Sequence, residues 1–194
     1  MADSTLVWAA TRPEDCAVFF RAPLGTTLPL LTAAPWASLP SPWMDHGWMG
    51  DDGMANSMKR DITDHQAFGG DIVKTTQNKY TETLKATCFE SNPNVWKTVF
   101  GDANVIIGGT THRQTTLNHE SLPLPRSCFL WRCIEGQKTR LVMVQQGQPI
   151  TIDDVVFVNK DLLKYTITIQ CFKPSPTVDA VQELIDEPDV PAGS

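Results

Sequence analysis

The sequence predicts a mainly β fold, a β-sandwich or barrel-like domain with one flanking α-helix and long extended loops. Three observations lead to this prediction. Apolar and polar residues alternate within 72–89 and again within 162–172, as they do in strands that bury one face. Turn signals containing Gly separate further short apolar runs. Before residue 174, only the segment 92–101 spaces its apolar residues as a helix does.

The length of 194 residues and the hydrophobic content of 41% fit one folded domain with an extension at each end. We expect an N-terminal arm at 1–14, a β domain at 15–173 and an acidic C-terminal tail at 174–194. The tail has five Asp or Glu residues and no Lys or Arg, so it carries −5 of the net charge of −6. Its apolar residues have a spacing that predicts a short amphipathic helix.

The first part of the β domain combines a strand with an unusual loop. Residues 15–21 form an apolar run, ended by Pro23 and Gly25, that predicts the first strand. The loop 22–42 contains five prolines, which exclude both a regular strand and a membrane span because proline removes backbone donors. Its Leu and Trp residues make it too apolar for a solvated linker, so we expect it to pack on a neighbouring surface.

A hairpin is expected next, at 43–62. Its predicted turn is Asp52-Gly53, because glycine supplies the positive φ that tight hairpin turns require. A second turn or bulge is predicted at Gly69-Gly70, before the long alternating strand 72–89.

The predicted helix 92–101 has clear end signals. Asn92 can accept hydrogen bonds from the first free N–H groups, and Pro93 fits the first helical position. Gly101 predicts a left-handed stop. The expected elements after it are strands at 128–134, 141–145, 150–158 and 162–172, with turns at Glu135-Gly136 and at 147–149.

The sequence contains no catalytic signature. Phosphate-binding, dinucleotide-binding, nucleophile-elbow and HExxH patterns are all missing from it. His112 and His119 lack close metal-ligand partners, and six Asp residues between 45 and 71 do not follow the calcium-loop spacing. The five cysteines have no regular spacing, which favours reduced, buried thiols. We therefore expect no enzyme activity, no cofactor and no bound metal.

The net charge of −6 and the lack of a basic run argue against a protein that grips nucleic acid. Met and Trp gather instead in the Gly- and Asp-rich hairpin region, where they indicate either core filling or an adaptable contact surface. Together with the loop leucines, they are the candidate subunit-interface residues: Leu28, Leu31, Trp36, Trp43, Met44, Trp48, Met49, Met54 and Met58.

Four segments carry a resemblance to a known family: 22–29 (APLGTTLP), 43–53 (WMDHGWMGDDG), 66–71 (QAFGGD) and 82–102, which includes Asn92-Pro93. In their order and spacing they resemble the major tail tube proteins of bacteriophages with long non-contractile tails (siphophages), above all those that infect actinobacteria. The likeness covers about residues 15 to 173.

The resemblance implies a structural virion protein, a viral tail protein assembled in the host cytoplasm. Its copies would form hexameric rings that stack by helical assembly into a tube. Its partners would be further copies, the tape-measure protein, and the tail terminator and distal tail proteins. DNA would pass through the tube during DNA ejection without specific binding, and no membrane is involved.

A channel for DNA should not hold phosphates, so we expect a bore with zero or negative net charge. The polar faces of 72–89 and 162–172 suggest lumen-facing candidates, although the sequence does not distinguish an inner from an outer face: Thr75, Gln77, Thr81, Thr83, Thr166, Thr168 and Gln170. Two alternatives stay open. One is another β-rich connector or tail-completion ring protein, and the other is a carbohydrate-binding β-sandwich module that uses exposed Trp36, Trp43 or Trp48.

Overall fold

The structure, a computed structural model, describes residues 7–29, 39 and 41–187. One eight-stranded sheet, a small two-stranded sheet, one α-helix and one short 3-10 helix make up the regular structure of these residues. In chain order the elements are β1 (Phe19–Pro23), β2 (Met44–Asp45), β3 (Met49–Gln66), β4 (Ile72–Cys88), α1 (Pro93–Phe100), η2 (Asp102–Asn104), β5 (Val105–Gly108), β6 (Gln114–Leu117), β7 (Ser127–Glu135), β8 (Lys138–Ile152), β9 (Tyr165–Cys171) and β10 (Val181–Asp186).

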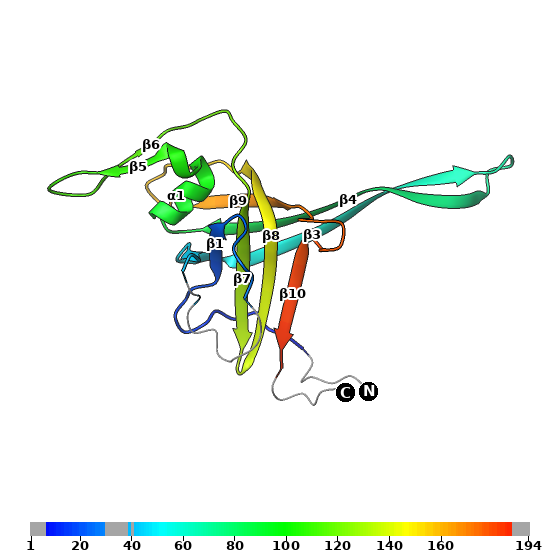
Figure 1. Cartoon of the computed structure of the whole chain (residues 1–194), viewed down its shortest axis with the longest axis horizontal. Helices are drawn as coiled ribbons and strands as arrows, with labels where there is room; N and C mark the ends of the chain where they lie inside the picture. The colour runs from blue at the N-terminus through cyan, green and yellow to red at the C-terminus, as the bar shows by residue number, and fades with distance from the viewer. Residues whose placement is uncertain (1–6, 30–38, 40, 188–194) are drawn as a thin grey trace.

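The large sheet has the order β2-β1-β7-β8-β9-β4-β3, and β10 also pairs with β8. All of its paired strands are antiparallel. The first half of β8 lies between β7 and β10, whereas its second half, from Gly147, pairs with β9. The sheet therefore forks at β8, and Figure 1 shows β7 and β8 crossing the direction of β3, β4 and β9.

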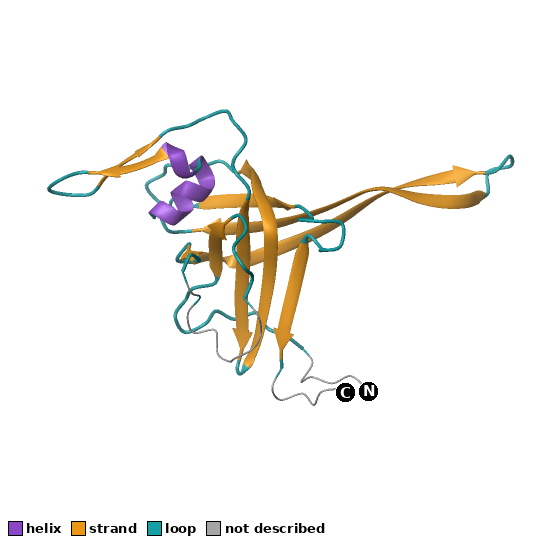
Figure 2. Ribbon diagram, in the orientation of Figure 1, coloured by secondary structure: helices purple, strands orange, loops and turns teal. Residues whose placement is uncertain are grey.

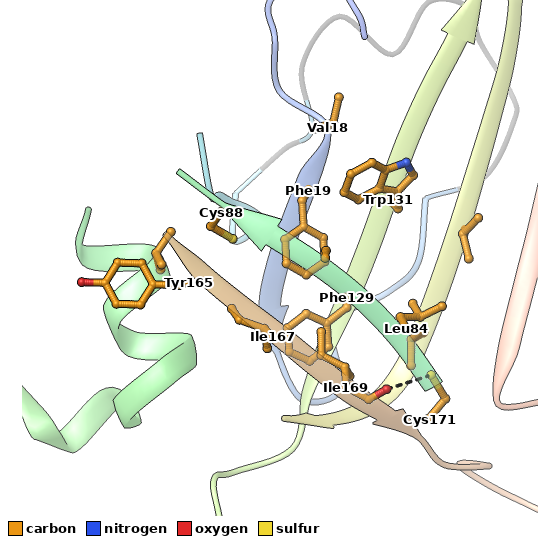
Figure 3. Packing of buried hydrophobic residues seen from close by; sticks show 14 of the residues in the cluster. Val18, Phe19, Leu84, Cys88, Phe129, Trp131, Tyr165, Ile167, Ile169 and Cys171 are labelled. Carbon is orange, nitrogen blue, oxygen red and sulfur yellow. Dashed lines mark hydrogen bonds between the residues drawn. The ribbon is translucent and has the colours of Figure 1, made fainter. Parts of the chain in front are cut away.

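The main core lies between the two parts of the sheet that diverge at β8. Phe19 from β1, Phe129 and Trp131 from β7, and Val144 from β8 pack in one cluster with buried residues of β4 and β9. Figure 3 shows Leu84, Ile167 and Ile169 facing the rings of Phe19 and Phe129. The Phe19 and Phe129 rings stack at 5.9 Å between centroids. These contacts confirm the prediction of a mainly β, sandwich-like fold with one helix.

A second, smaller cluster covers the other face of β1, β7 and β8. It contains Phe20, Leu28, Leu130, Leu141 and Met143. Leu39 and Trp43, which flank the undescribed part of the Pro-rich loop, pack against it. The described ends of that loop therefore lie on this chain's own sheet.

The helix prediction is confirmed. The Asn92 side chain accepts hydrogen bonds from the N–H groups of Asn94 and Val95, both at 3.0 Å, and Pro93 is the first helical residue. Gly101 ends the helix and donates its N–H to the Lys97 carbonyl. Its φ of 93° is positive, but its ψ of 149° is extended, so the predicted left-handed helical stop is wrong in detail.

The predicted hairpin 43–62 with a turn at Asp52-Gly53 is wrong. β3 runs on from Met49 to Gln66, and Gly53, with φ of 65°, lies in an irregular stretch of its pairing with β4. Positive φ serves here in a bulge and not in a turn. The chain reverses at 67–71, where Gly69 and Gly70 have positive φ, as the second turn signal predicted.

Three other expectations differ from the structure. The predicted turn at 147–149 lies inside β8, and the predicted strand 150–158 ends at Ile152. The amphipathic helix expected in the acidic tail is instead strand β10, whose six residues pair with β8 from Thr139 to Val144. A free strand edge on β8 offers this segment a full set of backbone partners, and such tertiary pairing overrides local propensity. The small hairpin β5–β6 was not predicted at all.

Candidate assembly surfaces

The longest hairpin, β3–β4, leaves the body of the protein. β9 pairs with β4 only from Cys88 to Glu82, so the part of β4 before Glu82 has β3 as its one strand partner among the described residues. We call this outer part, residues 58–82, the arm. Figure 2 shows it projecting as a two-stranded ribbon. A two-stranded ribbon is marginally stable in water and leaves both of its edges unpaired.

The arm carries apolar side chains that the described chain leaves mostly exposed. Four of them are more than half exposed, and Phe68 in the terminal turn is fully exposed; the set is Met58, Ile62, Phe68, Ile72 and Val73. Soluble monomers rarely gather apolar side chains in this way without a contact to make. Of these residues only Met58 is among the interface candidates predicted from the sequence. The sequence signal that was missed is a phenylalanine, Phe68, next to two turn glycines, which indicates an exposed aromatic side chain.

Strand pairing in the arm places the predicted lumen-facing residues of β4 on two different faces. The register of β3 against β4 shifts between Asp61 and Ile62, so Asn78 is an extra, bulged residue. Gln77 and Thr75 then stand opposite Ile62 and Asp64, which continue the face of Met58 and Arg60. Thr81 and Thr83 stand opposite Lys59 and Ser57, on the other face. The four residues of β4 therefore do not share one face.

Thr81 and Thr83 do share a face with the candidates on β9. Gln170 pairs with Thr83, Thr168 with Lys85, and Thr166 with Thr87. The hydroxyls of Thr87 and Thr166 are 2.9 Å apart. The face continues onto β8, where Gln148 pairs with Gln170 and Thr151 with Thr168. Lys85, the one charged residue in these pairs, forms an ion pair of 2.8 Å with Asp153, so this polar surface has almost no net charge over the sheet body.

The candidate Met and Trp residues fall into separate environments. Met49 and Met54 are half-buried against the main core, and Trp43 packs against the second cluster. Met44 is half-buried in β2. Trp48 is 53% exposed, with the Arg12 guanidinium 4.8 Å from its ring centroid. Core filling therefore accounts for part of the set, and among its described members Trp48 and Met58 are exposed.

Leu28 is buried in the second cluster, so contacts within the chain already account for it. Leu31 and Trp36 lie outside the described residues.

An apolar cleft lies at α1, between the helix and the segments 117–124 and 152–165. Its volume is about 540 Å³, and aromatic or aliphatic side chains form most of its wall: Trp96, Phe100, Val155, Phe157, Leu163 and Tyr165. Tyr165 accepts a hydrogen bond from the Trp96 indole at 3.2 Å, which fixes one side of the cleft. Phe157 is 82% exposed at its mouth. We call this surface the helix cleft.

His46 is a buried titratable group that belongs to the core. Its Nδ1 lies 3.2 Å from the Phe19 carbonyl, which can only accept, and its Nε2 lies 2.9 Å from the Thr98 hydroxyl. Complete burial lowers the His46 pKa to about 3, assisted by the charge of Arg21. The neutral ring therefore joins β1 to α1, and the arrangement is structural.

The cysteines are unpaired, as the sequence predicted: all five are free thiols, and four of them are buried. His112 and His119 flank β6, outside any cluster of ligands. The described ranges hold no group of three or more His, Cys, Asp or Glu side chains placed to bind a metal ion. Among the same residues, no helix has the length and apolar character needed to cross a membrane.

Comparisons with known proteins assign this chain to no family. No family model matches the sequence, and no curated protein matches it. The solved structures that match include the cap of the anti-feeding prophage, a tube-terminating cap known from electron cryomicroscopy. The match covers 96% of this chain and 100% of the cap chain, with 10% sequence identity and a TM-score of 0.45. A TM-score below 0.5 does not establish a common fold.

Proposed function

We propose that this chain is a structural subunit of a bacteriophage tail tube. In this proposal its copies form hexameric rings, the rings stack, and the stack encloses a channel for DNA and the tape-measure protein. The role is architectural and not catalytic. The proposal rests on the resemblance of the four sequence segments to tail tube proteins and on the surfaces described above.

The observation that carries the proposal is the arm, whose strand edges have no strand partner among the described residues. β3 is an edge strand of 18 residues, and within the described chain its outer half pairs with no strand except β4. Exposed edges and exposed apolar residues favour association, and closure into rings removes such edges. Such a chain is stabilised most when identical neighbours cover its exposed edges and apolar side chains.

The polar face of β8, β9 and β4 is our candidate for the channel wall. Its hydroxyl and amide side chains, with Lys85 neutralised by Asp153, would offer DNA few fixed cations. Without fixed cations there is little counterion release to hold phosphates in place. Thr83, Thr166, Thr168 and Gln170 are the residues that we assign to this wall.

In a virion, such a tube would join the tail terminator at one end and the distal tail proteins at the other. These partners, together with the siphophage assignment, assembly in the host cytoplasm and a role in DNA ejection, follow from the proposed function.

The test is electron microscopy of the purified full-length chain at rising concentration, alongside sedimentation velocity. Tubes or stacks of six-membered rings support the proposal. A connector or tail-completion protein would stop at a single ring. A chain that remains monomeric at millimolar concentration and shifts its tryptophan fluorescence with sugars would be a carbohydrate-binding module, and would overturn the proposal.

A further inference from the structure

We infer that the arm of one copy docks by its tip into the helix cleft of the next copy, with Phe68 beside Trp96. This inference rests on the proposed function only in requiring that copies of the chain associate. It adds which two surfaces meet.

The tip of the arm has a shape that can enter a pocket. Phe68 lies in the turn that joins β3 to β4 and is fully exposed. The two following residues, Gly69 and Gly70, have no atoms within 4 Å of the positions that their side chains would occupy. The ring therefore stands at the end of a narrow ribbon with open space around it. An aromatic ring in this setting is the type of anchor that dominates protein interfaces once it enters a pocket.

The helix cleft has the matching chemistry. Its wall is mainly aromatic and aliphatic, and a volume of about 540 Å³ has room for a phenylalanine side chain and for an aliphatic side chain next to it. Leu163 and Val155 pack against the main core on their inner sides, which makes the floor of the cleft firm. The exposed ring of Phe157 at the mouth would cover the side of an inserted residue.

The occupant of the cleft cannot be this chain's own tip. Figure 1 shows the arm pointing away from the body at one end of the long axis and α1 lying toward the other end. A contact between them must join two copies. It is heterologous, since the two surfaces differ, and repeated application of such a contact gives a closed ring or an open filament.

Charge also matches the tip to the cleft. Residues 61–76, on both strands around Phe68, hold three Asp residues (61, 64 and 71) and one cation, Lys74, which pairs with His65, so the tip is net acidic. Arg113 lies over the Trp96 ring at 5.8 Å, and Lys97 follows Trp96 on α1. Glu120 is the acidic residue in the cleft wall, and it accepts a hydrogen bond from Asn104 at 3.1 Å. A net acidic tip would therefore meet a cleft whose Trp96 ring carries the Arg113 guanidinium, which favours this orientation of the copies.

The first test compares the assembly of three full-length variants with that of the wild type. Phe68→Ser removes the tip anchor, and Phe157→Ser removes an exposed part of the cleft mouth. Ile185→Ser is the matched control, since Ile185 is 46% exposed and lies in neither surface. We expect the first two variants to raise the concentration needed for assembly by about tenfold or more, as loss of an anchor residue does. The control should assemble as the wild type does.

The second test uses a photo-crosslinking amino acid, benzoylphenylalanine, at position 68 in the assembled protein. The inference predicts crosslinks between copies to residues 96–100 or 155–165, identified by mass spectrometry. The docking inference would be overturned if assemblies form normally but crosslink elsewhere, or if Phe68→Ser assembles at the same concentration as the wild type. Either result would leave the proposed function unaffected. A wild type that never assembles would overturn both. Equal melting temperatures for wild type and variants would show that folding is not the cause.

Discussion

The ring of Phe129 occupies the space that a side chain on Gly147 would need. A Cβ placed on Gly147 would lie 2.5 Å from Cδ2 of Phe129 and 2.8 Å from Cγ2 of Ile169. Gly147 is also the residue at which β8 begins to pair with β9. The fork that turns one sheet into a sandwich therefore depends on a residue without a side chain, because the two layers meet at this point.

Replacing Gly147 with alanine should destabilise the fold. We expect a loss of about 1–3 kcal/mol in the free energy of unfolding, the usual effect of overpacking in a rigid core. Urea denaturation of wild type and variant measures it. Gly108→Ala is the control, since its added Cβ meets no atom within 4 Å and its effect should stay within about 0.5 kcal/mol. Equal stability of Gly147→Ala and wild type would mean that the layers are not tightly packed there.

The Asp15 carboxylate should stabilise the fold through Arg132. The Arg132 side chain is 2% exposed, and its Nη2 lies 2.6 and 2.7 Å from the two oxygens of Asp15. Removing one partner of a buried ion pair leaves a charge without compensation. Asp15 is itself 39% exposed, so water can replace part of the contact. We expect Asp15→Ala to cost about 2 kcal/mol, less than the loss of a fully buried pair.

Chemical denaturation of Asp15→Ala and of Lys164→Ala makes this comparison. Lys164 pairs with Asp161 at 3.6 Å on the surface, where loss of an ion pair changes stability by about 0.5 kcal/mol or less. An Asp15→Ala effect as small as that of the control would show that Arg132 does not need its carboxylate.

Acid should weaken the fold through His46. Burial lowers its pKa from 6.5 in the unfolded chain to about 3 in the folded protein. Between these values the unfolded chain binds a proton that the folded chain does not, so stability falls as the pH drops from about 6.5 towards 3. The slope from this residue approaches about 1.4 kcal/mol per pH unit.

Burial raises the pKa of Asp45, which acts in the opposite sense, so pH dependence is best compared between two proteins. The pH profiles of unfolding of wild type and His46→Gln provide this comparison. The variant should be less stable at pH 7, and the difference should shrink as the pH falls. A constant difference across this range would contradict a buried neutral imidazole.

Cys16 should react with thiol reagents faster than the other four cysteines. Burial raises the pKa of both Cys88 and Cys171 to about 12, so neither forms the reactive thiolate at neutral pH. Cys16 is the one partly exposed thiol. In the folded protein at pH 8, maleimide should label Cys16 alone within minutes, and all five cysteines after unfolding. Mass spectrometry identifies the labelled residues, and rapid labelling of Cys88 in the folded protein would contradict its burial.

The sequence by itself determined the features that depend on near neighbours. The helix at 92–101 was predictable because Asn92 and Pro93 act on N–H groups within one turn. The β class was predictable because alternation marks a strand with one buried face, as in β9 and the second half of β4. Met58 stays a predicted contact residue, and the structure leaves its side chain 59% exposed.

Only the tertiary structure decided which strands pair, and where a strand leaves its sheet. β10 is a strand because β8 has a free edge for it, and β8 passes through Gly147 because β9 continues the pairing there. The arm projects because β9 ends opposite Glu82, which exposes Phe68 far from the core. Strand partners come from distant parts of the chain, so local patterns cannot specify them, and the candidate assembly surfaces follow from those partners.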